Sequence, residues 1–362
     1  PFECQLDPEH GLPSNLLSVY RRPLPSANVA FLRQGGDPQK FDIMWDAREE
    51  DLRTQFINAT LFHGQTTVVP DDVSITQGAQ FQAGMFTGQV LDGVARDLTG
   101  GDGSGALGGP ENLWDWRKIQ VEDPLCANTT GSSGELLCEG IKRKHLVPER
   151  VNIGSELYDS FTAPVGHPPK QQAKRESIAR GEALFDSRVF TINFVAGLND
   201  IKGDVDGTEP GTCSTCHSNL NVGNDTAGDP KRLGIMDNSN GVNVMPATPD
   251  FPRFAFYCAT GSIPFFSNPV TSPNCPGSTP GNDATCDEFI TTDPGKGLVN
   301  GKCADLGKMK VPVLRGLASR APYFHGGNAA TLEDVVNFYN KRFNIGFTGQ
   351  EITDLANYLN SL

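Results

Sequence analysis

Two cysteines and a histidine follow the spacing C-x-x-C-H in the segment GTCSTCHS, residues 211–218. At this spacing Cys213 and Cys216 can each form a thioether with a vinyl group of one porphyrin, and His217 then lies beneath the iron as its proximal ligand. A thioredoxin-like dithiol would require a strand before the motif and a helix after it, and a zinc site would require a second ligand pair. The sequence indicates neither context. It therefore predicts one covalently attached haem c.

The net charge of the chain argues against one large class of partners. Lys and Arg total 30 against 43 Asp and Glu, which gives a formal net charge of -13 over 362 residues. Because no basic stripe is available to neutralise phosphates, we expect no nucleic-acid partner. An acidic surface is compatible with a basic redox protein as electron donor or acceptor. No apolar run approaches the roughly 18 residues that span a bilayer, so we expect no transmembrane segment.

Seven further cysteines favour disulfides and an oxidising compartment, which places the protein in the periplasm or outside the cell. Short loops favour two pairs and leave a third: Cys126–Cys138, Cys275–Cys286 and Cys258–Cys303. Sequence alone does not fix this connectivity. Cys4 is then left over, and the chain starts at Pro1 without a signal peptide. We therefore expect a mature or trimmed product in which the partner of Cys4 lies upstream.

A polar stretch with several prolines divides the chain. We interpret residues 166–176 as a linker between an N-terminal domain, 1–165, and a C-terminal domain, 177–362. The segment SIARGEALF, residues 177–185, has the small and apolar spacing of the helix that opens many cytochrome c domains. The expected fold class is mainly α, with a cytochrome c-like haem domain that carries long loop-rich insertions. The N-terminal domain is expected to be loop-rich and partly helical, with a helix from about Ala47.

Two helices are predicted near the C-terminus. In TLEDVVNFYN, which begins at Thr331, apolar side chains recur at i, i+3, i+4 and i+7 and share one helical face. They are Leu332, Val335, Val336 and Tyr339. In TGQEITDLANYLNSL, Thr348 and Glu351 form a capping box ahead of an apolar stripe. That stripe consists of Ile352, Leu355, Ala356 and Leu359.

Blocks at both ends of the chain are similar to one known family. KVPVLRGLASRAPYFHGGNAATLEDVVNFYN (Lys310–Asn340) resembles an L-R-N, A-P-Y-F-H and T-L-E-x-V run that follows a haem motif. MWDAREEDLRTQ (Met44–Gln55) resembles a W-D-G-R-x-x-x-L-x-x-Q segment, and RRPLPSANVAFL (Arg21–Leu32) resembles the stretch before it. These are motifs of the bacterial di-haem cytochrome c peroxidase and MauG family. The resemblance implies that residues 1–165 are related to the family's first cytochrome c domain.

The resemblance also implies which residues surround the haem. The family places an axial ligand fourteen residues after the histidine of A-P-Y-F-H, and Tyr339 stands there in this chain. The peroxidases have methionine at that position, whereas MauG-like members have tyrosine, which lowers the potential. Alternatively, Tyr339 is only a core aromatic and the ligand is Met309, Met236 or Met245. Arg315 is expected at the cofactor, and His325 either supports the haem by hydrogen bonding or is a plain turn residue.

The family's peroxide chemistry implies a second group of residues. Trp45 matches the tryptophan between the two haems, which can carry an electron or hole; its alternative is a packed core residue. Gln55 matches a glutamine of the peroxide pocket. Where the family commonly has a catalytic glutamate stands Gln65, with His63 close by. Because a glutamine cannot shuttle a proton as a carboxylate can, either His63 substitutes or the chain performs another reaction.

The family's first haem motif has no counterpart here. Residues 1–212 contain no C-x-x-C-H, so we expect an upstream segment that carries it; the alternative is a one-haem descendant. The resemblance implies a redox protein whose His217 haem stores or relays electrons for peroxide-linked oxidation at a second haem. One alternative is a non-enzymatic electron-transfer subunit of a larger complex. Another is a haem-bearing structural module whose cysteine-rich insertion binds a partner.

Calcium is a further ligand that the sequence leaves open. Asp204, Asp206 and Glu209 in GDVDGTEPG faintly resemble a calcium loop. Their spacing departs from the EF-hand pattern, so a solvated acidic turn is the preferred interpretation.

Overall fold

The computed structural model describes residues 4–6, 18–29, 43–112, 121–122, 142–143, 157–163, 166–200, 208–217, 232–233 and 251–362. Its α-helices are α1 (Leu52–Asn58), α2 (Asp72–Gly84), α5 (Pro169–Ser187), α6 (Cys213–Cys216), α7 (Lys296–Asn300), α8 (Leu332–Phe343) and α9 (Gly349–Ser361). Shorter helical turns are η3 (Ala59–His63), η4 (Asp159–Thr162), η5 (Cys303–Asp305) and η6 (Leu317–Ser319). The strands are β1 (Cys4–Leu6), β2 (Leu91–Asp92), β3 (Arg96–Asp97), β4 (Val121–Glu122), β5 (Lys142–Arg143), β6 (Phe190–Asn193), β7 (Thr208–Gly211), β8 (Arg232–Leu233), β9 (Phe254–Cys258), β10 (Pro269–Ser272), β11 (Ala284–Thr291) and β12 (Met309–Lys310).

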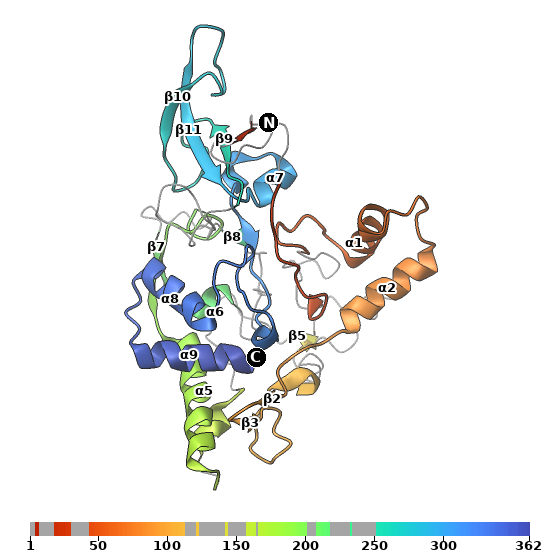
Figure 1. Ribbon diagram of the computed structural model, residues 1–362, viewed down its shortest axis with the longest axis vertical. Coiled ribbons are helices and arrows are strands. Elements are labelled where there is room, and N and C mark those ends of the chain that lie inside the picture. Colours follow the sequence, from red (N-terminus) through yellow and green to blue (C-terminus); the bar gives the residue numbers. More distant parts are fainter. Residues whose placement is uncertain are drawn as a thin grey trace.

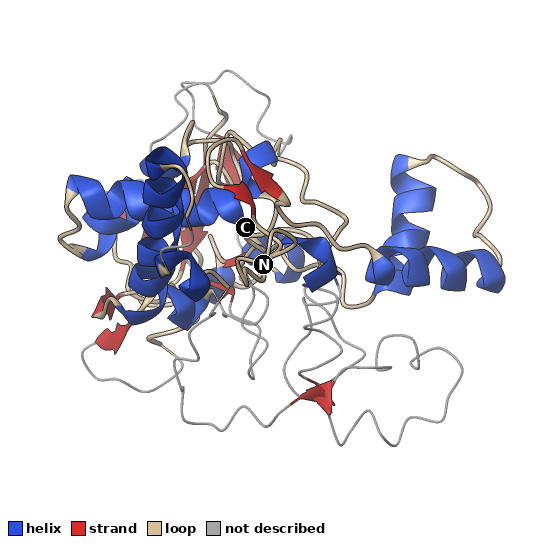
Figure 2. Cartoon of the chain, turned by 90° about the horizontal axis from the view of Figure 1, so that it is seen from below, coloured by secondary structure: helices blue, strands red, loops and turns tan. Residues whose placement is uncertain are grey.

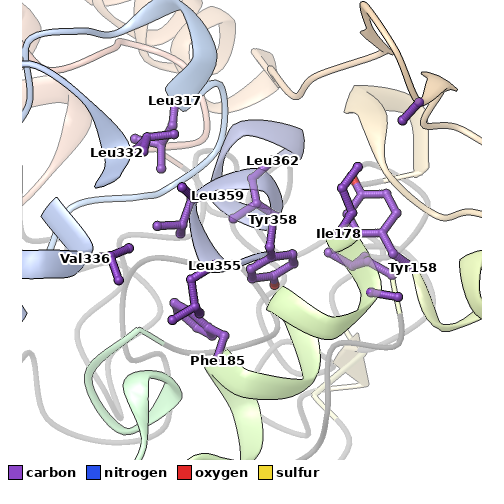
Figure 3. Packing of buried hydrophobic residues seen from close by; sticks show 14 of the residues in the cluster. Tyr158, Ile178, Phe185, Leu317, Leu332, Val336, Leu355, Tyr358, Leu359 and Leu362 are labelled. Atoms are coloured by element: carbon purple, nitrogen blue, oxygen red, sulfur yellow. The ribbon is translucent and has the colours of Figure 1, made fainter. Parts of the chain in front are cut away.

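Helices α5, α8 and α9 surround the main hydrophobic core, which Figure 3 shows from close by. α5 and α9 meet at Gly181, where a Cβ atom would lie 2.0 Å from the carbonyl oxygen of Asp354. Only glycine permits this approach. The Asp354 carboxylate accepts hydrogen bonds from Ser177 Oγ at 2.5 Å and Arg180 Nε at 2.9 Å, so the crossing is fixed by polar contacts as well.

Both predicted C-terminal helices are present. Thr348 and Glu351 form the expected capping box of α9. α8 begins with a second capping box, between Thr331 and Asp334, which the sequence analysis did not identify. α8 ends at Asn344, whose φ of 49° lies in the left-handed region that asparagine tolerates.

The predicted linker, residues 166–176, is wrong from Pro169 onward, because α5 spans Pro169–Ser187. The polar composition that suggested a linker is equally compatible with a helix. Lys, Gln, Glu, Arg and Ala are good helix formers, and a proline in the first turn lacks only an N–H that would have no partner there. Arg175, only 1% exposed, also shows that this segment is packed, since it donates hydrogen bonds to Ala95 O and Asp102 Oδ2.

The predicted boundary between two domains does not separate two cores. Leu98, Leu157, Tyr158 and Phe161, from the N-terminal side, are buried in the same cluster as α5, α8 and α9. Further upstream, α1 and α2 form a hairpin that projects from the main body (Figures 1 and 2). The expected helix from Ala47 begins instead at Leu52, because the Asp51 side chain caps it by accepting a hydrogen bond from Thr54 N.

The cysteine-rich insertion contains a regular sheet where mainly loops were expected. Strands β1, β9, β11 and β10 form an antiparallel four-stranded sheet, at the top of Figure 1. Two predicted disulfides are confirmed: Cys258–Cys303 joins the sheet to η5, and Cys275–Cys286 closes the hairpin of β10 and β11. The expected pair Cys126–Cys138 lies outside the described residues.

Candidate haem-binding site

The C-x-x-C-H segment follows the second strand of a two-stranded sheet. β7 pairs antiparallel with β6, and the backbone then forms α6, a single turn over Cys213–Cys216. Thr212 and Thr215 cap this turn reciprocally. The His217 N–H donates to the Cys213 carbonyl oxygen at 3.0 Å. The strand that we did not expect before the motif is therefore present. α6 contains the motif itself, and residues 218–231, which follow it, lie outside the described ranges.

The two motif cysteines are partly buried and pack against apolar clusters. Neither Cys213 nor Cys216 belongs to a disulfide. Burial, followed by the charges of Cys216 and Asp186, raises the pKa of Cys213 to about 12. Reactive dithiols have lowered pKa values, so this environment disfavours the dithiol alternative.

A cavity of about 390 Å³ lies against the motif, and Cys213, Cys216 and His217 line one side of it. This volume falls within the range of cofactor pockets. Most of the other lining side chains are apolar, and they come from β6, α5, α8 and α9 and from the segments 22–25 and 309–325. They include Phe185, Phe190, Val336, Phe343, Leu355 and Leu359. Two thiols and an imidazole in an apolar enclosure fit haem c, which needs two thioethers, an iron ligand and walls for its macrocycle.

Helix α8 forms the wall that carries the predicted sixth ligand. Arg342, in its last turn, donates to Asn193 Oδ1 and Asn193 O at 2.9 Å each, which ties α8 to β6. Because β6 pairs with β7, the same contacts fix α8 relative to the C-x-x-C-H turn. Phe190 of β6 also stacks on Phe343 of α8, with ring centroids 5.5 Å apart.

Two of the proposed sixth ligands line this cavity. Tyr339 is partly buried, and its ring is nearly parallel to that of Phe343, with centroids 6.3 Å apart. Burial, with smaller effects from Cys216 and Cys213, raises the pKa of Tyr339. Met309 is 5% exposed and lines the same cavity, so it remains the alternative ligand. The other two alternatives, Met236 and Met245, lie outside the described residues.

Trp45 lies in a wall shared by two cavities. A second cavity has a volume of about 360 Å³. It shares part of its lining with the first cavity, and the shared residues include Trp45, Arg22, Val313 and Arg320. Trp45 Nε1 donates to the Arg22 carbonyl oxygen at 2.7 Å. Its ring is edge-on to that of His325, with centroids 6.2 Å apart. This arrangement brings together Trp45 and the His217 cavity, as the resemblance implied.

The predicted peroxide-pocket residues are only partly assembled. Gln55 and His63 both line the second cavity. Gln55 Oε1 is buried without a hydrogen-bond partner, so a donor from a ligand could reach it. Gln65 is exposed, has a left-handed φ of 52° and lines neither of these two cavities. The position where the family has its glutamate therefore does not contribute to the site, which corrects the expectation for Gln65.

Arg315 is a buried cation with unsatisfied donors. It is 2% exposed, and its Nε and Nη1 have no hydrogen-bond partner. Burial lowers the pKa of its guanidinium. An unpaired buried charge is costly, and a carboxylate such as a haem propionate is the kind of group that satisfies a guanidinium. Arg315 lines the second cavity and not the first. The predicted role at the cofactor therefore fits a carboxylate group that extends into the second cavity.

A buried ionic network beside Trp45 was missed by the sequence analysis. Arg21 donates to both oxygens of Asp293, at 2.6 and 2.7 Å, and to Asp46 Oδ2 at 2.5 Å. Next to it, the 5% exposed His325 has its Nε2 3.8 Å from Asp293 Oδ2. No local pattern could have revealed the contact, because Arg21 and Asp293 are 272 positions apart. The burial of His325 beside this network supports a packed residue over a plain turn residue.

Other sites are not indicated within the described ranges. No cluster there brings together three or more His, Cys, Asp or Glu side chains that could hold a metal ion, and the calcium expectation gains no support. Asp204 and Asp206 lie outside those ranges. Over the same residues, no helix is both long and apolar enough to cross a membrane.

Comparison with known proteins gives short matches to one class of enzyme. No protein-family model matches the chain. It is 42% identical over 65 residues to cytochrome-c peroxidase IdrP2 of Denitromonas iodatirespirans, which covers 18% of this chain and 17% of that protein. It is 38% identical over 69 residues to cytochrome-c peroxidase IdrP1 of the same organism, which covers 16% of this chain and 18% of the relative. Cytochrome c551 peroxidase of Nitrosomonas europaea is 36% identical over 77 residues, 20% of this chain and 23% of that protein.

These matches span about a fifth of the length of the curated relatives. All three relatives carry the name cytochrome c peroxidase, and haem c is the cofactor that the C-x-x-C-H motif and its apolar cavity fit. The chain is therefore related, over part of its length, to the cytochrome c peroxidases.

Proposed function

We propose that this chain is a c-type haem redox protein of the di-haem peroxidase and MauG kind, with Cys213, Cys216 and His217 as the residues that hold the haem. The observation that carries the proposal is the position of the C-x-x-C-H turn on an apolar cavity of about 390 Å³, which Tyr339 and Met309 also line. When bound there, haem supplies reversible one-electron chemistry. The two disulfides support an oxidising compartment such as the periplasm.

The residues of the chain divide the work in this proposal. Cys213 and Cys216 would hold the cofactor, and His217 and Tyr339 would be ligands of its iron. The apolar walls from β6, α8 and α9 exclude water from it. Trp45, in the wall between the two cavities, would lie between this cofactor and a second redox centre at the cavity that Gln55 and His63 line. The haem at His217 would supply stored electrons for peroxide-linked oxidation at that centre.

The runner-up is a non-enzymatic electron-transfer subunit. Peroxide activation needs a positioned acid or base. Gln65 is exposed, and no carboxylate lines the second cavity among the residues that the structure describes there. Among the described residues that line the second cavity, His63 is the only histidine. This observation favours electron transfer without catalysis by this chain alone.

A combined redox and peroxide experiment tests the proposal. A preparation proven to hold one haem is expected to show a reversible one-electron couple in spectroelectrochemistry. Mixed with hydrogen peroxide in a stopped-flow instrument, it should bleach only slowly and irreversibly, because His217 and Tyr339 would both be ligands of the iron and Gln65 stands where the family has its catalytic glutamate.

Two results would contradict this division of roles. Absence of any reversible couple would rule out electron storage. A fast, saturable reaction of the one-haem preparation with peroxide would show that a second centre is unnecessary. Restoration of fast peroxide turnover only in a longer, two-haem polypeptide would support the proposal.

A further inference from the structure

Arg22 makes three separate connections around Trp45. Its guanidinium donates to three successive carbonyl oxygens, those of residues 320–322: Nη1 to Arg320 O at 2.6 Å and to Pro322 O, and Nη2 to Ala321 O at 3.4 Å. Its backbone N–H donates to the His325 carbonyl oxygen at 2.7 Å. Its own carbonyl oxygen accepts the Trp45 indole N–H at 2.7 Å. One residue thus joins Trp45 to the loop before α8.

The chemistry of the side chain suits this position. Three carbonyl oxygens that converge on one point create a negative potential, and no carboxylate takes part in the contact. A planar guanidinium can donate to several carbonyls at once, whereas a lysine ammonium is a compact point charge with different geometry. Arg320 lies beside it, and its own guanidinium is directed to the Val313 carbonyl oxygen at 2.8 Å. The two arginines therefore satisfy separate sets of carbonyls in the same wall.

Arg22 and Trp45 line both cavities. We propose that Arg22 is a positioning residue: its guanidinium, bound to the carbonyls of residues 320–322, fixes the Arg22 carbonyl that holds Trp45 in the wall between the two cavities. The position of the Trp45 indole then depends on the Arg22 side chain, which itself transfers no electron between the cavities. What this means for electron transfer rests on the proposed function, but the positioning itself does not.

The indole N–H of Trp45 provides a direct readout. With 15N-labelled tryptophan in the full chain, its resonance can be assigned by its disappearance in Trp45→Phe. In the wild type we expect slow exchange of this proton with D₂O, because it is hydrogen-bonded. In Arg22→Ala the carbonyl loses its anchor, and exchange should be at least about tenfold faster. The exchange rate in Arg22→Lys should lie between these two rates, because lysine keeps the positive charge but lacks the planar, forked guanidinium.

Chemical rescue separates positioning from general loosening. Guanidinium chloride far below denaturing concentrations should restore slow exchange in Arg22→Ala, whereas sodium chloride of equal ionic strength should not. Arg53→Ala is the matched control: Arg53 lies on α1, where it binds Thr76 Oγ1 at 2.5 Å, and its removal should leave the exchange rate unchanged.

Three outcomes would overturn the proposal. The first is exchange in Arg22→Ala within about twofold of the wild type. The second is an equal acceleration in Arg53→Ala. The third is a failure of guanidinium to restore slow exchange in a folded Arg22→Ala chain. If Arg22→Ala does not fold, the comparison of Arg22→Lys with the wild type decides, and equal rates would refute the role of the fork. None of these measurements depends on haem chemistry, so the proposed function can fail while this proposal stands.

Discussion

A chain that carries Cys213→Ala together with Cys216→Ala is expected to lose all covalently bound haem. The two thiols line the same apolar cavity as His217, and they are the two cysteines outside disulfides in the part of the chain where the structure reports cysteine pairing. Without their thioethers only coordination and burial would hold a porphyrin, and neither survives denaturation. The measurement is haem-specific staining of a denaturing gel beside a protein stain, so that loss of haem is distinguished from loss of protein.

The matched control removes two other cysteines. Cys258→Ala with Cys303→Ala breaks a disulfide whose cysteines are 45 positions apart. Loop-closure entropy at that separation predicts a loss of about 4 kcal/mol in the free energy of unfolding, with covalent haem retained. Denaturant titration measures the first effect and the stained gel the second. Haem that stays bound to the Cys213/Cys216 variant, or that is lost equally from both variants, would contradict the assignment.

The second large effect is expected for Tyr339→Phe, which should turn the ferric visible spectrum toward high spin. Removal of the phenol oxygen would take away the proposed iron ligand and keep the ring that stacks on Phe343. The control is Met309→Leu, a substitution of similar volume at a buried position that should cost less than about 1.5 kcal/mol in stability. That variant should keep the wild-type spectrum. A high-spin spectrum in Met309→Leu with an unchanged spectrum in Tyr339→Phe would transfer the ligand to Met309.

The sequence was most informative where the signals are local. Helix α9 was predicted with its cap because the Thr348 and Glu351 box and the apolar stripe lie within one segment. The haem motif is also a local signal, since its three reactive groups lie within five residues, and the structure brings all three to one cavity. The two confirmed disulfides could be predicted because a short loop favours Cys275–Cys286, and Cys258 and Cys303 are the pair that remains once the short-loop pairs are assigned.

Features that depend on distant segments could not be predicted. The four-stranded sheet brings β1 beside β9, although about 250 residues separate them, so no periodicity within the insertion reveals it. The packing of Leu157 and Tyr158 under α5 follows from Glu182, whose carboxylate accepts both of their backbone N–H groups at 2.7 Å. A polar segment such as Pro169–Ser187 resembles a linker until these contacts are known. The role of Arg22 has the same origin, because its partners lie almost 300 positions away.

Haem retention by the wild-type chain tests the central claim most directly. Purified protein is denatured, extracted with acidified organic solvent and assayed for haem in both phases, with the haem-to-polypeptide ratio taken from the pyridine haemochrome spectrum. We predict that one haem per chain stays with the polypeptide, because Cys213 and Cys216 hold it through thioethers. Porphyrin that passes into the organic phase, or a polypeptide that never acquires haem when it is produced with a cytochrome c maturation system, would contradict the account.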